Sequence, residues 1–201
     1  MNPRLAGVRQ ELLEMAEEDL RVRAELAADG SLFEGYHPRM RGVHDKHATR
    51  LARIMAEHGW PVEPLVGVEG ARAAWLIVQH AIAQPAIQRR AFGVLSAAAR
   101  RREVPAWQAA TLEDRIRIYE GRPQRYGTQF DWDPAGELNP LPIEDPAGLD
   151  GRRKAVGLRP MQDEIQNQRD TAAEAGEHAP ADWEGRRREM DMWLREVGWR
   201  S

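Results

Sequence analysis

Apolar residues recur at helical spacing along most of this chain, and this pattern limits the fold more than any other feature of the sequence. The first series covers residues 3–29, and Asp29-Gly30 follows it as a typical helix C-cap. Its apolar positions are Leu5, Val8, Leu12, Met15, Leu20, Val22 and Leu26. The sequence therefore predicts a long N-terminal helix that packs through one face.

Several further helices are predicted in the same way. A second helix is expected from His37-Pro38 to His58-Gly59, because proline is tolerated in the first turn. Residues 59–70 are predicted to form a loop, and residues 71–83, apolar nearly all round, a buried helix. The remaining helices are predicted at about 86–102, 105–121, 146–156, 160–176 and 181–197.

The segment from Arg122 to Asp145 differs in amino-acid composition from the rest of the chain. It is rich in proline, glycine, aspartate and aromatic residues, and Asp133-Pro134-Ala135-Gly136 is a good turn between two extended arms. A small β-hairpin or ordered loop is predicted at about 122–145. The expected fold class is mainly α, a multi-helix, bundle-like single domain that carries this element.

The expected domain organisation follows from length and pattern. A chain of 201 residues is long enough to bury one core. Residues 1–160 are expected to form a helical core domain that includes the 122–145 segment. Residues 161–201 are expected to form a C-terminal helical extension that packs on the core.

Composition excludes several classes of protein. A net charge of −3 provides no positive field for a phosphate backbone, so a nucleic-acid partner is not expected. The absence of cysteine excludes disulfides, thiolate nucleophiles and cysteine-ligated metals. No signal peptide is recognised, and no run approaches the roughly 18 apolar residues that span a bilayer. A cytoplasmic protein that does not bind membranes is the expectation.

Histidines are unusually frequent near apolar surfaces of the predicted second helix. The apolar face comprises Met40, Leu51, Ile54 and Met55, and the histidines within or beside it are His37, His44, His47 and His58. Such residues are commonly core side chains that bond a carbonyl or carboxylate. A metal is the alternative, because His44 and His47 are one turn apart, with His80 or an acid as third ligand. A stand-alone HxxH spacing is a weak signal.

Polar residues also interrupt two other predicted helices. Gln79 and His80 end an apolar run, where they would form either a structural clamp or the polar floor of a pocket. A neutral histidine there suits general acid–base chemistry. On the fifth helix, Asp114 and Arg115 lie off the apolar stripe, so they could both face solvent. Alternatively, Asp114 could orient a histidine and Arg115 could bind an anion.

Further candidate ligand-binding residues lie in and after the hairpin segment. Tyr126 and Gln129 belong to a stretch dense in donors, acceptors and aromatics, which could cover the helices or contact a ligand. Arg152 and Arg153 form a pair that could recognise an anion or bridge Glu144 or Asp145. The familiar GxSxG, P-loop, GxGxxG and HExxH signatures are absent from the sequence.

The chain resembles an uncharacterised, actinomycete-type bacterial family, a domain of unknown function. The resemblance covers about residues 36–160 and rests on the elements GWP, QH, EDR and YGTQF. The matching positions are His37, His44, Gln79, His80, Asp114, Arg115, Gln124, Tyr126, Gly127, Gln129, Arg152 and Arg153. At His47 the family more often has asparagine, which counts against a metal site built on His44 and His47. The resemblance implies no activity.

The leading functional hypothesis is a metal-independent small-molecule enzyme of hydrolase or lyase type that needs no cofactor. Its catalytic residues would be His80, His44 and Asp114. Its substrate-binding residues, for a polar or anionic ligand, would be His37, Gln79, Arg115, Tyr126, Gln129, Arg152 and Arg153.

Two other hypotheses remain open. One is a non-catalytic binding or interaction module in which exposed tryptophans form a partner surface, with a homodimer through the C-terminal tryptophan-bearing helix. Those tryptophans are Trp132, Trp183, Trp193 and Trp199. The other is a metal site built on His44, His47 and His80.

Overall fold

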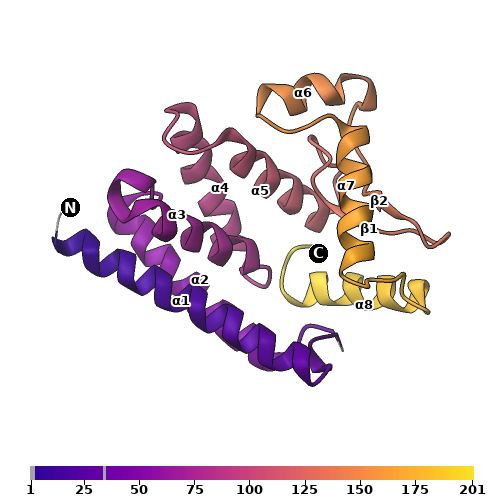
Figure 1. The fold of residues 1–201 in the computed structure, drawn as a ribbon, viewed down its shortest axis with the longest axis horizontal. Coiled ribbons are helices and arrows are strands. Elements are labelled where there is room, and N and C mark those ends of the chain that lie inside the picture. Colours follow the sequence, from indigo (N-terminus) through magenta and orange to yellow (C-terminus); the bar gives the residue numbers. More distant parts are fainter. Residues whose placement is uncertain (1–2, 34) are drawn as a thin grey trace. The chain divides into compact units, whose positions relative to one another are not determined.

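The computed structural model describes residues 3–33 and 35–201, and the described chain is mainly α-helical with one small β-hairpin (Figure 1). The predicted fold class is therefore confirmed. The chain divides into two compact units, Met1–Val104 and Pro105–Ser201. The boundary between these compact units differs from the domain boundary expected between residues 160 and 161. Whether the chain folds as the two expected domains stays a prediction.

The first unit is a helical bundle. It comprises α1 (Pro3–Ala28), the short 3₁₀ helix η1 (Ser31–Phe33), α2 (Pro38–His58), α3 (Glu63–His80) and α4 (Pro85–Arg100). Helix α1 packs against α2 and α3, and α2 also contacts α3 and α4. Fully buried side chains of four helices form its core, including Leu12, Leu51, Ile77 and Leu95.

The helix boundaries in this unit follow local sequence signals. Pro38 occupies the first turn of α2, where the Nδ1 atom of His37 accepts a hydrogen bond from the Arg39 amide at 3.2 Å. Gly59 ends α2 with a φ of 75°, in the left-handed region that glycine adopts readily. Both ends of this helix were predicted from these residues.

The predicted loop over residues 59–70 is wrong, because α3 begins at Glu63. Pro64 lies in the first turn, where proline does not interrupt a helix. Gly67 has a φ of 72° inside the helix and produces a kink. The proline and the glycine of this segment thus form a helix start and a bend.

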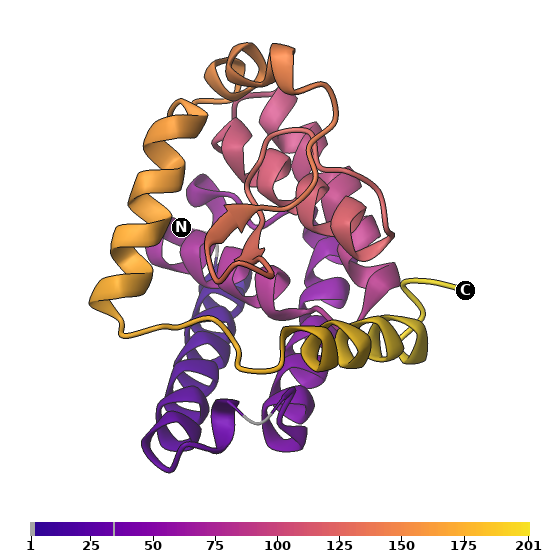
Figure 2. The same cartoon turned by 90° about the vertical axis from the view of Figure 1, so that its right-hand side faces the viewer.

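The second unit combines four helices with the hairpin (Figure 2). Its elements are α5 (Ala106–Tyr119), β1 (Phe130–Trp132), β2 (Leu138–Pro140), the 3₁₀ helix η2 (Pro146–Gly148), α6 (Leu149–Ala155), α7 (Met161–Glu174) and α8 (Trp183–Glu196). The two strands pair antiparallel with Asp131 opposite Asn139, and α7 packs against β2. The hairpin lies within the segment predicted for it. None of the described helices combines the length and the apolar character needed to cross a membrane.

The tryptophans of the C-terminal region stabilise the second unit from within. Trp199 is only 4% exposed, although a partner surface would require it to be exposed. The ring of Trp193 packs edge-on against Tyr119, and the Trp183 indole donates a hydrogen bond to the Trp132 carbonyl at 2.6 Å. These contacts connect α8 to α5 and to the hairpin.

Candidate metal centre

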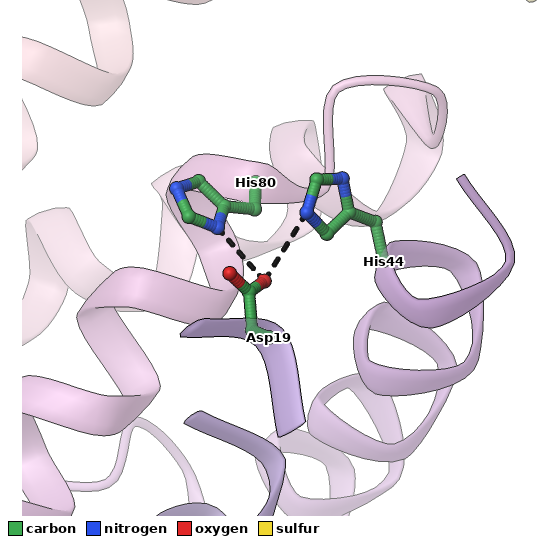
Figure 3. A group of neighbouring side chains, drawn as sticks. All are labelled: Asp19, His44 and His80. Carbon is green, nitrogen blue, oxygen red and sulfur yellow. Dashed lines mark hydrogen bonds and ion pairs between the residues drawn. The ribbon is translucent and has the colours of Figure 1, made fainter. Parts of the chain in front are cut away.

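Three polar side chains from three helices of the first unit meet at one point. Asp19 comes from α1, His44 from α2 and His80 from the last turn of α3 (Figure 3). The Oδ2 atom of Asp19 lies 2.8 Å from His80 Nδ1 and 3.1 Å from His44 Nε2. One nitrogen of each histidine and this oxygen all lie within 4.8 Å of one another.

Helical periodicity brings Asp19 to this point. The buried positions of α1 include residues 12, 15, 19, 22 and 26, which alternate in steps of three and four. Asp19 is 1% exposed, whereas its neighbour Leu20 is 55% exposed. Leu20 was predicted to lie on the packing face, and this prediction is wrong, because the carboxylate of Asp19 occupies the core position instead.

The Asp19 carboxylate is charged at neutral pH despite its burial. Burial acts to raise the pKa of this group, but the contacts with His44 and His80 outweigh that effect and hold the pKa well below its usual value. Among the described residues, the side chains that contact the carboxylate are the two histidines. Asp19 is thus a buried anion that lacks a lysine or arginine partner.

Tyr36 holds the far side of the His44 ring. Its hydroxyl lies 2.7 Å from His44 Nδ1, and the two rings stack with centroids 5.7 Å apart. The rings of His44 and His80 lie 5.0 Å apart. Contacts on both of its nitrogens therefore fix the orientation of His44, so that Nε2 faces Asp19.

Two buried atoms of the cluster make no hydrogen bond. One is Asp19 Oδ1, and the other is His44 Nε2, whose 3.1 Å contact with Asp19 lacks hydrogen-bond alignment. Figure 3 shows both contacts meeting at one oxygen of Asp19, Oδ2, while the other oxygen contacts neither ring. Buried polar atoms without partners are uncommon in folded proteins, and they often mark a bound ion or water.

The other histidines of α2 do not join this cluster. His47 is 1% exposed, and its Nε2 lies 3.0 Å from Glu18, which also accepts a hydrogen bond from Lys46. Burial lowers the pKa of His47, although the contact with Glu18 opposes this. His37 caps α2, and His58 lies 3.6 Å from Glu57. The third member of the cluster is therefore Asp19, whereas the metal hypothesis had named His47 beside His44 and His80.

A surface groove of the first unit lies along α1 and α2. Its charged walls include two ion pairs, Arg50 with Glu11 and Lys46 with Glu18. The residues that line it do not include Asp19, His44 or His80. The groove and the cluster are therefore separate features.

The candidate residues of the second unit gather around the loop 124–129, where Asp114 is central. Its buried carboxylate accepts hydrogen bonds from the amides of Arg125, Tyr126 and Thr128 and from the Thr128 hydroxyl, at 2.7–3.1 Å. Burial raises the pKa of Asp114, although these hydrogen bonds oppose the rise. Asp114 thus binds the loop backbone, and its bonded partners include no histidine.

Arg152 and Arg153 bind the same loop from its other side. Arg152 donates to the Arg125 carbonyl at 2.8 Å. Arg153, 1% exposed, donates to the carbonyls of Tyr126 at 2.6 Å and Gly127 at 3.1 Å. Gly127 has a φ of 67°, a conformation that favours glycine, and a Cβ there would lie 2.8 Å from the Met161 sulfur.

The side chains of Gln124 and Gln129 complete this network. Arg115 donates to the Gln129 side chain at 3.1 Å, and Gln124 bonds the amide and the carbonyl of Gln129. The residues predicted for one site thus lie in two separate groups, one with His44 and His80 and one around the loop. The predicted ligand residue Gln79 is partly buried and precedes His80 in the chain. Asp19 is a candidate ligand that was not predicted from the sequence.

The fold and the cluster define a mainly α-helical protein whose N-terminal unit contains a two-histidine, one-carboxylate site. The chain belongs to the Family of unknown function (DUF6624), whose model matches residues 6–174. This confirms the resemblance to a domain of unknown function and extends it to α1, which carries Asp19. No curated protein and no solved structure was found to match the chain.

Proposed function

We propose that the first unit binds one divalent transition-metal ion through Asp19, His44 and His80. The single observation that carries this proposal is the convergence of three ligand atoms within 4.8 Å of one another in a buried site. The unpaired Asp19 Oδ1 and His44 Nε2 support it, because an ion would provide the partner that His44 Nε2 lacks.

Charge also favours a cation at this point. A buried carboxylate is unfavourable unless it is paired or coordinates a metal. Asp19 contacts two imidazoles, which are neutral when they act as metal ligands. A divalent ion would neutralise the buried charge without the need to protonate either ring.

The donor set limits the choice of ion. Imidazole nitrogen together with one carboxylate oxygen suits zinc, iron or cobalt better than magnesium or calcium, which prefer all-oxygen sites. Ligands about 2.1 Å from a tetrahedral ion lie roughly 3.4 Å apart. The two contacts of Asp19 Oδ2, at 2.8 and 3.1 Å, are close to this spacing.

The activity proposed for this site is that of a small-molecule enzyme of hydrolase or lyase type. A bound ion would supply Lewis-acid activation of a substrate oxygen or of water. The protein would provide the buried surroundings that strengthen this effect, since Asp19 is 1% exposed.

Metal-independent acid–base catalysis by His80 is the second candidate. The 2.8 Å contact between His80 Nδ1 and Asp19 would orient the ring and leave Nε2 as the proton acceptor. In this alternative Asp19 has the orienting role that the sequence analysis gave to Asp114. The two candidates differ in whether the cluster takes up a metal.

Isothermal titration calorimetry of the metal-stripped protein with Zn²⁺ distinguishes them. We expect one zinc ion per chain for the wild type and for His58→Ala, a control histidine on the same helix as His44. The His80→Ala variant should lose this binding. A wild-type protein that binds no zinc or cobalt would rule out the metal proposal and favour the acid–base alternative.

Tyr36→Phe is expected to weaken zinc binding by about 10- to 100-fold, the usual effect of removing a group that orients a metal-bound histidine. The Tyr36 hydroxyl would accept the Nδ1 proton of His44 and so keep Nε2 free to bind the ion. Competition with a chromophoric chelator measures the affinity, and Tyr126→Phe in the second unit is the control. Equal affinities for the two variants would show that Tyr36 does not orient the ligand.

A further inference from the structure

The cluster provides fewer protein ligands than a closed metal site needs. Structural zinc sites are usually bound by four protein ligands, whereas catalytic sites use three and keep one position for water or substrate. In the part of the chain that the structure describes, three residues meet this geometry. His47, one turn further along α2 from His44, is not among them.

Exposure differs sharply among the three ligands. The side chains of Asp19 and His44 are 1% and 9% exposed, whereas that of His80 is 27% exposed. His80 is therefore the most accessible of the three ligands. A small molecule that approaches the ion would come from this side.

The unpaired oxygen of Asp19 defines what such a molecule should carry. Oδ2 faces both histidines, while Oδ1 is buried and accepts no hydrogen bond. If Oδ2 binds the ion, Oδ1 is the second oxygen of the same carboxylate and lies beside the ion. It can then accept a hydrogen bond from a ligand bound to that ion. A ligand with a metal-binding oxygen next to an O–H or N–H group would satisfy both atoms.

We infer that the metal keeps an open coordination position on the His80 side, which takes water or a small anionic ligand that also donates a hydrogen bond to Asp19 Oδ1. This inference rests on the proposed metal function. It identifies the ligand class as small oxygen-donor anions with an adjacent O–H or N–H group, of which hydroxamates are the simplest probes. Azide tests the open position alone, because it is an anion without such a donor.

Cobalt spectroscopy of the full-length protein tests the inference without a known substrate. The metal-stripped wild type is loaded with one equivalent of Co²⁺, and its visible spectrum is followed as azide or acetohydroxamate is added. We expect both anions to shift the spectrum. Acetohydroxamate should bind at least about 10-fold more tightly than N-methylacetohydroxamate, which has the same two oxygen donors but no N–H, as one additional charge-assisted hydrogen bond would give. His44→Ala with cobalt provides the background.

The outcomes separate the two claims. If Co²⁺ binds but neither anion changes the spectrum, the coordination sphere is closed and the inference is wrong, while the metal proposal stands. If acetohydroxamate and N-methylacetohydroxamate bind equally, the role of Asp19 Oδ1 is refuted. If the protein binds no Co²⁺, both the proposed function and this inference fail.

Discussion

Replacement of Asp19 by asparagine is expected to reduce the affinity for Zn²⁺ by more than about 100-fold, because even an outer-shell partner of a metal ligand contributes about 10- to 100-fold. The substitution keeps the size of the side chain but removes the carboxylate, which is the one acidic group in the cluster that the described residues form. Affinity is measured by competition with a chromophoric chelator.

The same variant should retain its fold in the absence of metal. The asparagine side chain would occupy the same buried position on α1, between Met15 and Val22, and the loss of a buried charge is not expected to unfold the helix. Circular dichroism of the metal-free protein provides this control, and His58→Ala provides the affinity control. A folded Asp19→Asn protein that binds zinc as tightly as the wild type would contradict the assignment of Asp19 as a ligand.

Replacement of Asp114 by asparagine is expected to lower the free energy of unfolding by about 2–4 kcal/mol, because buried donors would lose their charged acceptor. Each oxygen of Asp114 accepts at least two hydrogen bonds from the loop. In either orientation, the amide group of asparagine would therefore point N–H groups at N–H or O–H donors. Urea unfolding followed by circular dichroism measures the loss.

Glu113→Gln is the matched control for Asp114→Asn. Glu113 is the preceding residue on α5, and its contact is a 3.3 Å ion pair with Arg125 at the partly exposed surface. Such pairs contribute roughly 0–1 kcal/mol. If the two variants were equally stable, Asp114 would not be the residue that holds the loop.

Much of the helical fold is predictable from the sequence because its signals are local. The start of α2 at Pro38 and its end at Gly59 depend on residues within one turn of each boundary. The prediction of a loop over residues 59–70 was wrong because these local signals are ambiguous. Pro64 and Gly67 are also compatible with the start and the bend of a helix. Residues of α3 pack against α1 and α2, and such non-local contacts cannot be read from the local pattern.

The candidate site was predicted in part. His44 and His80 were selected because polar residues at apolar helix positions need partners. Asp19 escaped selection because α1 is rich in charged residues, and one more acid does not stand out. The three- and four-residue steps through residues 12, 15, 19, 22 and 26 could have identified it as a buried carboxylate.

The role of Asp114 lay beyond such reasoning. Its partners are backbone amides 11 to 14 residues further along the chain. Backbone groups are the same in every sequence, so no residue pattern marks them as partners of a particular carboxylate. The same limit applies to Arg153, whose acceptors include two loop carbonyls.

The most direct test of the metal centre is an anomalous diffraction measurement at the zinc edge on crystals of the full-length protein grown with Zn²⁺. The metal proposal predicts one strong peak about 2.0–2.2 Å from Asp19 Oδ2, His44 Nε2 and His80 Nδ1. An anomalous map without a peak at this cluster, from crystals that contain zinc, would contradict it.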